Sequence, residues 1–293
     1  MIHLNLKSMT TRRTFVKKAG AGLLAVGASS VFFNEELYAM PSPEKKPKKE
    51  DLFKVSMAGY SFLHFDIDKT LEMMKRVNVN YLCIKDFHLK LSASQEECDA
   101  FQAKLKTNGV TGYAVGPIYM DKSEKQIDDA FEYAKRAGVK MVVGIPKYEY
   151  LPYVDKKVKE YDFKYAIHIH GPDNPLYPNA KNVWDNVKHL DPRIGICLDI
   201  GHDARDGFDP VEDLKKYHTR VHDIHIKDVT APNKGGRTCE MGRGILDIPA
   251  FVKMLRKVKY AGACSLEYEK DMRDPLAGIA ESIGYFKGVM DAS

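Results

Sequence analysis

The sequence of 293 residues lacks features that would each point to a different class of protein. Its five cysteines, an odd number, argue against a framework of disulfide bonds. Met57-Ala58-Gly59-Tyr60-Ser61, which follows the first β-like run, is not the glycine-rich phosphate turn of an open dinucleotide-binding sheet. A basic excess is also absent beyond residue 50, where 36 basic and 36 acidic residues remain. We therefore expect no nucleic-acid partner.

The first 39 residues are predicted to be an export signal. Thr11-Arg12-Arg13-Thr14-Phe15-Val16-Lys17 has the twin-arginine pattern, and an apolar run from Ala19 to Phe33 follows it. This run is shorter than the ~20 residues of a membrane-spanning helix, so we expect no stable membrane anchor. Leu37-Tyr38-Ala39 offers a signal-peptidase site, and a basic tail is the competing interpretation. The pattern predicts export to the periplasm through the twin-arginine pathway.

The rest of the chain is predicted to consist of a spacer followed by one domain. Residues 40–51 form a spacer rich in proline and lysine, and residues 52–293 show β-like runs that alternate with helical patterns. The eight runs are 54–58, 81–84, 110–115, 139–145, 164–169, 194–200, 221–226 and 263–267. Eight βα units in this length predict a (β/α)8 TIM barrel, in the α/β class, and an open doubly wound sheet is the alternative.

Helix boundaries are marked between these runs. Ser94-Gln95-Glu96-Glu97 and Ser123-Glu124-Lys125-Gln126 have the pattern of a capping box, and Asp209-Pro210 combines an N-cap with a first-turn proline. Gly109 and Gly138 fall where helices end with a glycine.

Barrel active sites form where the strands end, and polar residues gather at these ends. Seven of the ten histidines lie between positions 168 and 225. In run 194–200, the two-residue period of a strand directs Ile196 and Leu198 to the helices and Asp199 into the barrel. The same alternation directs His225 and Lys227 inward in the next run.

Four inward residues predict a metal site. Run 263–267 contributes Glu267, and run 164–169 contributes His168, with His170 on the same face. Neighbouring strand ends then offer mixed nitrogen and oxygen ligands at a similar height, namely His168, Asp199, His225 and Glu267. Such a set suits one divalent ion, which we expect to be Mn²⁺, Zn²⁺, Co²⁺ or Mg²⁺.

The end of run 81–84 adds two further polar candidates. Lys85 shares the inward face with Cys83, and we favour a functional role for this lysine. For His88, a contact to substrate and a place in a solvated loop are equally supported. Cys83, Cys197 and Cys264 lie within β-like runs and are predicted to be core thiols.

Several motifs resemble one family, the xylose isomerase-like sugar isomerases and epimerases, whose relatives include endonuclease IV. The motifs are Cys197-Leu198-Asp199-Ile200-Gly201-His202, His225-Ile226-Lys227-Asp228, Met241-Gly242-Arg243-Gly244 and Ser265-Leu266-Glu267. The resemblance implies that Asp199, His225 and Glu267 bind the metal ion and that Glu267 doubles as an acid/base. It also implies that His202 and Arg243 contact oxygens of the sugar.

The remaining candidates complete the predicted site. Lys85 and His170 join Glu267 as catalytic candidates, while Lys227 and His88 join the substrate-binding set.

The sequence departs from this family on the fifth run. The family usually has a glutamate there, followed two residues later by histidine, whereas this chain has His168-Ile169-His170. In two-base epimerases that glutamate is one of the two proton-transfer groups, so a symmetric pair of glutamates is not expected here. His168 can still ligate a metal ion as a neutral imidazole.

The expected chemistry is enolisation of a non-phosphorylated sugar or keto-sugar by an isomerase or epimerase. A metal-dependent lyase or hydratase of 3-keto-glycosides is the alternative within the fold, because elimination needs only one strong base. A non-catalytic sugar-binding barrel is the alternative of another class. The neutral domain and the export signal oppose a DNA-repair role, and the oligomeric state stays open.

Overall fold

The structure, a computed structural model, describes residues 51–293. The predicted signal at 1–39 and residues 40–50 of the predicted spacer therefore lie outside the described residues. Asp51, the last residue of that spacer, accepts hydrogen bonds from the guanidinium of Arg256 at 2.6 and 2.8 Å. Between residues 51 and 293, no helix is long and apolar enough to cross a membrane.

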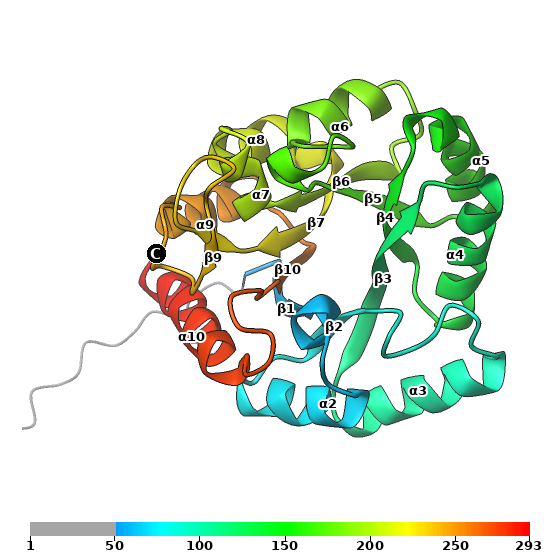
Figure 1. Cartoon of the computed structure of the whole chain (residues 1–293), viewed down its shortest axis with the longest axis horizontal. Helices are drawn as coiled ribbons and strands as arrows, with labels where there is room; N and C mark the ends of the chain where they lie inside the picture. The colour runs from blue at the N-terminus through cyan, green and yellow to red at the C-terminus, as the bar shows by residue number, and fades with distance from the viewer. Residues whose placement is uncertain (1–50) are drawn as a thin grey trace, which may run out of the picture. The chain divides into compact units, whose positions relative to one another are not determined.

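The chain folds as a closed barrel of parallel strands, which confirms the predicted fold class (Figure 1). Each strand pairs with its neighbours in chain order, and the first strand pairs with the last to close the barrel. The barrel strands are β1 (Lys54–Ala58), β2 (Tyr81–Ile84), β3 (Thr111–Met120), β4 (Met141–Pro146), β5 (Lys164–His168), β6 (Ile194–Asp199), β7 (Val221–Ile226) and β10 (Ala263–Leu266).

Helices surround the strands in a ring, as Figure 1 shows. They are α2 (Ile67–Arg76), α3 (Gln95–Thr107), α4 (Glu124–Arg136), α5 (Leu151–Tyr161), α6 (Ala180–Val187), α7 (Ile200–Arg205), α8 (Pro210–Tyr217), α9 (Ile248–Lys257) and α10 (Leu276–Ala292). The short 3-10 helices are η2 (Gly59–Phe62), η3 (Tyr148–Tyr150), η4 (Gly171–Asp173) and η5 (His218–Arg220). A small antiparallel hairpin, β8 (Asp228–Val229) with β9 (Thr238–Cys239), follows β7.

Most predicted strands match the observed ones within one or two residues, and the exception is β3. The prediction ended this strand at residue 115, whereas it continues to Met120. The pairing of β3 with β4 shifts register between Val115 and Ile118, around Pro117. Proline has no N–H group to donate to a neighbouring strand, so a proline in the sequence indicates the end of a strand. Here the strand continues past Pro117 because the register shift accommodates the missing hydrogen bond.

The predicted helix caps form with one difference. Ser94 and Glu97 make a reciprocal capping box at α3, and Asp209 accepts a hydrogen bond from the backbone N–H of Val211 at α8. Ser123 begins α4 as predicted but makes no capping hydrogen bond. Gln126 instead accepts from the backbone N–H of Lys122, one residue before the expected partner.

The core has two apolar layers, one between the strands and the helices and one inside the barrel. The outer layer holds the large side chains that alternate along the strands, such as Ile196, Leu198 and Ile224. The inner layer is made of small side chains, namely Cys83, Ala114, Val143, Ala166 and Cys197. Cys264 lies in the outer layer. All three cysteines of the strands are therefore core residues, and they are buried free thiols, as predicted.

A polar network fills the remaining interior. Tyr113 donates a hydrogen bond to Asp223 at 3.1 Å, and its hydroxyl also contacts Ser265. Ser265 in turn bonds Ser56 at 2.6 Å, which links β1, β3, β7 and β10 through side chains. Because every member has a partner, the interior tolerates these polar groups next to the inner apolar layer.

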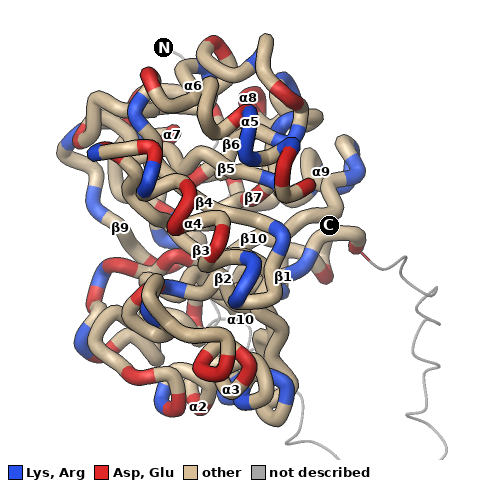
Figure 2. Tube along the Cα trace, turned by 90° about the vertical axis from the view of Figure 1, so that its right-hand side faces the viewer, with Lys and Arg blue, Asp and Glu red and all other residues tan. Residues whose placement is uncertain are grey.

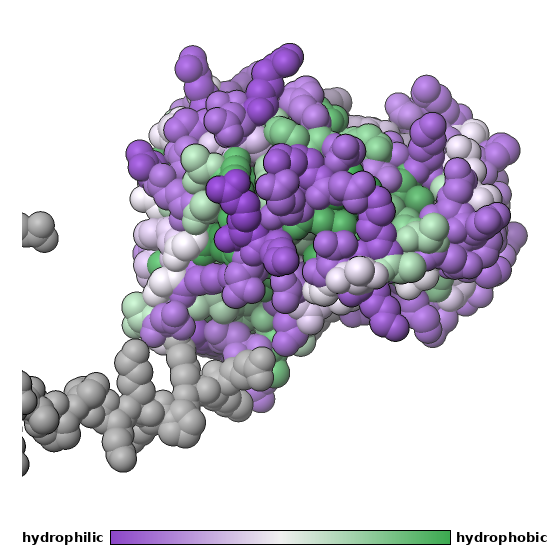
Figure 3. Space-filling model, turned by 90° about the horizontal axis from the view of Figure 1, so that it is seen from below, coloured by the Kyte–Doolittle hydropathy of each residue, from purple (hydrophilic) through white to green (hydrophobic). Residues whose placement is uncertain are grey.

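The outer surface is polar and carries both signs of charge. Lysine and arginine residues are interspersed with aspartate and glutamate on the face shown in Figure 2. Hydrophilic residues cover most of the face visible in Figure 3, with smaller hydrophobic patches between them.

Asp203 and Asp213 form a buried carboxyl pair between α7 and α8. Oδ1 of Asp203 accepts from the backbone N–H of Ala180 at 3.1 Å. Burial and the nearby carboxylate of Asp213 raise the pKa of Asp203 well above its ordinary value. Burial also raises the pKa of Asp213. The folded pair therefore retains a proton that the unfolded chain releases near pH ~4.

We expect the contribution of this pair to stability to decrease as the pH rises above ~4, the ordinary pKa of an aspartate in the unfolded chain. A raised folded-state pKa stabilises the fold below the unfolded pKa, and the contribution is lost as pH rises through the folded pKa. Asp213→Asn removes one of the two carboxyl groups, so its free energy of unfolding should decrease less with rising pH than that of the unmodified chain. Urea unfolding at a series of pH values measures the difference.

Glu212→Gln is the matched control, because Glu212 lies on the same helix with a side chain that is 61% exposed. This variant should keep the pH dependence of the unmodified chain. If the free energy of unfolding decreased equally with rising pH in Asp213→Asn and in the unmodified chain, the proposal that Asp203 and Asp213 retain a proton in the folded state would be contradicted.

Candidate metal centre and active-site cavity

Asp199 connects the end of β6 to the start of α7. It is the N-cap of α7, and its Oδ1 accepts from the backbone N–H of His202 at 2.9 Å. Its Oδ2 is buried and makes no hydrogen bond within residues 51–293. One carboxylate oxygen therefore orients the helix, while the other faces cations, and the ammonium of Lys227 lies 3.1 Å from it.

The structure brings the four predicted ligands together at the ends of four consecutive strands. Nε2 of His168 lies 3.0 Å from Nδ1 of His225 and 3.8 Å from Oδ2 of Asp199. Oε2 of Glu267 lies 3.8 Å from Nε2 of His168 and 3.5 Å from Nδ1 of His225. All four ligand atoms lie within 4.8 Å of one another, and all four residues are buried.

These separations fit a bound divalent ion. Ligand atoms at roughly 2.0–2.2 Å from an ion lie ~2.8–3.6 Å apart at the corners of an octahedron or a tetrahedron. The nearest donor pairs already lie at 3.0 and 3.5 Å. Oδ2 of Asp199 accepts no hydrogen bond and already lies 3.1 Å from one cation, the ammonium of Lys227. The residues fit a metal ion, and histidine with carboxylate ligands suits zinc or a harder divalent ion.

The electrostatics of the cluster favour the ligand forms of His168 and Glu267 and oppose that of Asp199. Burial holds the pKa of His168 well below its ordinary value, so its imidazole is neutral. Burial raises the pKa of Asp199 to about 6, against the opposing charge of Lys227. Burial would also raise the pKa of Glu267, but the charges of Lys227 and His225 outweigh it and hold this pKa well below its usual range.

Lys227 lies beside the cluster and balances its charge. Its side chain is 1% exposed, and its Nζ lies 3.1 Å from Oδ2 of Asp199 and 2.7 Å from Oε2 of Glu267. The same Nζ lies 2.7 Å from Oε2 of Glu269 and 3.2 Å from Nε2 of His202. The inward direction of Lys227 agrees with the prediction, and the structure places its ammonium among carboxylates.

A cavity of about 200 Å³ opens above these residues at the C-terminal ends of the strands. His168, Glu267, His202, His170 and Lys85 line it, so the structure brings five predicted site residues to one cavity. His170 also lies 3.0 Å from the hydroxyl of Tyr119 through Nε2, and burial lowers its pKa to about 4. Lys85 forms an ion pair with the adjacent Asp86.

Four further residues line this cavity that were not among the predicted site residues, and these are Tyr60, Pro117, Tyr119 and Glu269. Tyr60 follows the end of β1 and Glu269 follows the end of β10, so the rule that located Asp199 could have located both. Tyr119 lies beyond the predicted end of β3, and therefore no sequence signal placed it at a strand end.

Two predicted substrate contacts lie away from the cavity. Nε2 of His88 is 3.2 Å from the backbone oxygen of Phe65 and 3.2 Å from the hydroxyl of Thr70, and burial lowers the pKa of this imidazole to about 4. Arg243 pairs with Glu281 of α10, and its side chain is 62% exposed. Neither residue is part of the cavity lining.

Asp228 organises the loop that follows β7. Its buried carboxylate accepts from the backbone N–H groups of Val229 at 2.8 Å, Gly242 at 2.9 Å and Gly244 at 3.0 Å. Leu246 donates a fourth, longer hydrogen bond at 3.3 Å. The aspartate that ends the His225-Ile226-Lys227-Asp228 motif thus holds the segment of Arg243 against the barrel.

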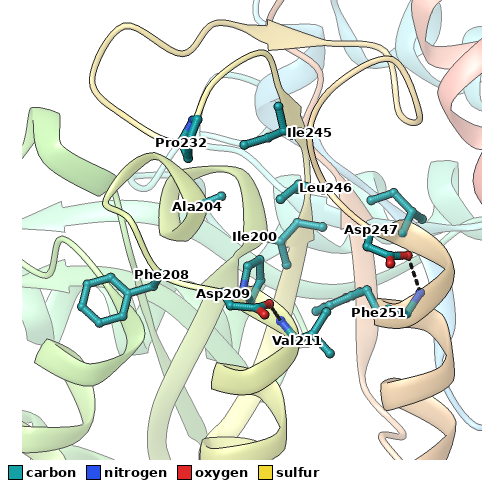
Figure 4. A pocket seen from close by; sticks show the side chains of 13 residues that line it. Ile200, Ala204, Phe208, Asp209, Val211, Pro232, Ile245, Leu246, Asp247 and Phe251 are labelled. Atoms are coloured by element: carbon teal, nitrogen blue, oxygen red, sulfur yellow. Dashed lines mark hydrogen bonds between the residues drawn. The ribbon is translucent and has the colours of Figure 1, made fainter. Parts of the chain in front are cut away.

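A second cavity, of about 340 Å³, lies outside the barrel mouth between α7, α8 and α9 (Figure 4). Its apolar lining includes Ile200, Phe208 and Ile245. Figure 4 also shows the hydrogen bonds by which Asp209 and Asp247 cap α8 and α9 beside it. None of the predicted site residues lines this cavity.

Residues 75–289 match the Xylose isomerase-like TIM barrel family. The chain belongs to this family. The matched segment runs from the end of α2 into α10, so it includes all four residues of the metal cluster.

One relative is the inosose dehydratase of Geobacillus kaustophilus (strain HTA426), which is 28% identical over 131 residues. That match covers 39% of this chain and 41% of the relative, so the chain spans less than half the length of that protein.

Two solved structures share the fold across most of the chain. The 3-keto-D-glucoside 4-epimerase of E. coli has a TM-score of 0.66 and 15% identity, and the match covers 80% of this chain and 99% of that protein. The IolI protein, solved with a bound zinc atom, has a TM-score of 0.64 and 18% identity, with 82% and 97% covered. At these identities the likeness shows the fold alone.

Replacement of Asp228 tests its role in the loop. We expect Asp228→Asn to lower the free energy of unfolding by about 2 kcal/mol or more, because the amide turns an N–H₂ group toward backbone donors and loses charge-assisted hydrogen bonds. Urea unfolding measures the change. Asp271→Asn is the control, since Asp271 is exposed and accepts two longer backbone hydrogen bonds at 3.2 Å. Equal stability of the two variants would contradict the assigned role.

Proposed function

We propose that the chain is a divalent-metal-dependent enzyme that enolises a non-phosphorylated sugar or keto-sugar, as an isomerase or epimerase. The observation that carries this proposal is the buried cluster of His168, Asp199, His225 and Glu267 at the base of the 200 Å³ cavity. A divalent ion held by these four residues would polarise a carbonyl and its neighbouring hydroxyl, which makes a carbon-bound proton removable. The zinc atom bound by the IolI protein supports zinc as one candidate.

Glu267 is the residue best placed to accept that proton. It lines the cavity, and its Oε2 makes the contacts to Lys227, His168 and His225. These contacts all use Oε2, which leaves Oε1 to contact the substrate. The low pKa of Glu267 keeps the group ionised at neutral pH.

Lys85 and His170 supply the other polar contacts of the cavity. Lys85 carries an ammonium that can donate to an oxygen of the substrate while Asp86 compensates its charge. His170 is neutral at pH 7, because burial lowers its pKa to about 4, and the hydroxyl of Tyr119 lies 3.0 Å from its Nε2. These groups orient a polyhydroxylated ligand without requiring a second carboxylate.

The cavity favours a small substrate without phosphate. Its volume of about 200 Å³ lies below the roughly 300–1,000 Å³ of sites for drug-sized ligands. No arginine lines it within residues 51–293, and the ammonium of Lys227 is already engaged by carboxylates. A phosphate group would therefore lack the charged fork that usually binds it.

Elimination is the second candidate, and the identity of residue 168 supports it. His168 stands where the resemblance predicts a glutamate, and its low pKa makes it a poor proton acceptor. A lyase or hydratase of 3-keto-glycosides needs one ionised base, which Glu267 provides, and a proton for the leaving oxygen, which Lys85 provides. The named relatives include a dehydratase and an epimerase, so they support both outcomes.

Deuterium exchange by NMR on a panel of free sugars and 3-keto sugars with added Mn²⁺ tests the proposal. We expect exchange at a carbon next to the carbonyl, and Glu267→Gln should slow it by roughly 10²–10⁴-fold because the base is lost. Exchange with a rearranged sugar indicates an isomerase or epimerase. Release of an aglycone or of water indicates the lyase or hydratase.

Glu281→Gln is the matched control, because Glu281 pairs with Arg243 outside the cavity and should leave the rate unchanged. Preference for phosphorylated sugars would contradict the proposed substrate class. Absence of exchange, together with no bound ion and no rise in melting temperature with Mn²⁺, would favour a non-catalytic sugar-binding barrel.

We also propose that the chain is exported to the periplasm, on the basis of the Arg12-Arg13 pattern. The double substitution Arg12→Lys and Arg13→Lys keeps the charge but removes the arginine pair, so the periplasmic fraction should fall to background. Cell fractionation followed by immunoblotting measures it. Lys17→Arg, which leaves the pair intact, should be exported like the unmodified chain. Equal periplasmic amounts of all three chains would rule the pathway out.

A further inference from the structure

The side chain of Lys227 ends among acceptors that a divalent cation would also use. Its Nζ lies 2.7 Å from Oε2 of Glu267, 2.7 Å from Oε2 of Glu269 and 3.2 Å from Nε2 of His202. The lysine side chain is buried, so water does not compete for these contacts. Each distance is that of a hydrogen bond to a full ammonium charge.

His202, Glu267 and Glu269 by themselves have the composition of a metal site. One ligand atom of each lies within 4.8 Å of the others. This trio adjoins the first cluster, because Glu267 belongs to both. Clusters that share a carboxylate are typical of proteins that bind two divalent ions side by side. The barrel mouth thus presents ligands for two cations, and the ammonium of Lys227 contacts all three members of the second set.

The charges favour a single divalent ion beside this lysine. Asp199, Glu267 and Glu269 carry three negative charges when ionised, and Lys227 lies within 3.1 Å of an oxygen of each. The ammonium and one divalent ion together supply three positive charges, which balances the carboxylates. A second divalent ion would add two uncompensated charges at low dielectric and would compete for ligands already engaged.

We infer that the ammonium of Lys227 takes the position of a second divalent ion, so that the barrel mouth binds one metal ion per chain instead of two. This inference rests on the proposed metal-dependent function and specifies its stoichiometry. Because the ammonium is covalently attached, a chelator cannot remove it. The cavity therefore keeps one permanent positive charge beside Glu267 whatever metal is available.

Metal counting on the full chain tests the inference. Protein stripped with a chelator is dialysed against Mn²⁺ and its bound manganese is measured by atomic spectroscopy. The unmodified chain should bind one Mn²⁺, while Lys227→Met, which removes the charge at similar volume, should bind two. Adding Glu269→Gln to Lys227→Met removes a ligand of the second set only, so the count should return to one.

Lys85→Met is the matched control, because Lys85 lines the cavity next to the cluster but pairs with Asp86 and with none of the three carboxylates. Its count should stay at one. If Lys227→Met does not fold without metal, Lys227→Gln takes its place, and its melting temperature should rise more with Mn²⁺ than that of the unmodified chain.

The outcomes separate this inference from the proposed function. One ion in both the unmodified chain and the folded Lys227 variant would overturn the inference and leave the metal-dependent function standing. Two ions in the unmodified chain would overturn it as well. No ion in the unmodified chain would overturn the metal-dependent function, and the single-ion assignment with it.

Discussion

The contact between the ammonium of Lys227 and three carboxylates is the interaction on which the rest of the site depends. Asp199, Glu267 and Glu269 come from the ends of two strands and would repel one another strongly where water is excluded. The ammonium lies 2.7–3.1 Å from an oxygen of each. Because this charge is balanced, the carboxylates can stay ionised, as the proposed metal binding and the proposed proton removal both require.

Close packing around the side chain of Lys227 determines where its ammonium group lies. The side chain enters beside Gly201 on α7, where an added Cβ would meet Cγ of the lysine at 2.9 Å. Asp199 starts the same helix with one oxygen and faces the metal cluster with the other. The turn from β6 into α7 therefore positions a ligand, brings His202 to the cavity and leaves room for the lysine. A larger residue at position 201 would disturb all three.

Local patterns predicted the fold and the four residues of the metal cluster. The apolar alternation around Asp199 and His225 and the regular spacing of strands and helices are short-range features, and both appear in the structure. Tyr119 was missed because a register shift around Pro117 disguises the true end of β3. His88 and Arg243 were predicted to contact the substrate and were therefore expected at the cavity. In the structure neither lines the cavity, because His88 contacts the backbone oxygen of Phe65 and Arg243 pairs with Glu281.

By itself, the sequence determined which side chains point into the barrel, because a two-residue period and barrel closure leave one direction for each strand residue. Only the tertiary structure decided what each inward side chain contacts, since those contacts join strands far apart in the chain. The pattern directed Lys227 inward as a substrate contact. The fold places its ammonium between Glu267 and Glu269, where a fixed positive charge offsets the repulsion of the two neighbouring carboxylates.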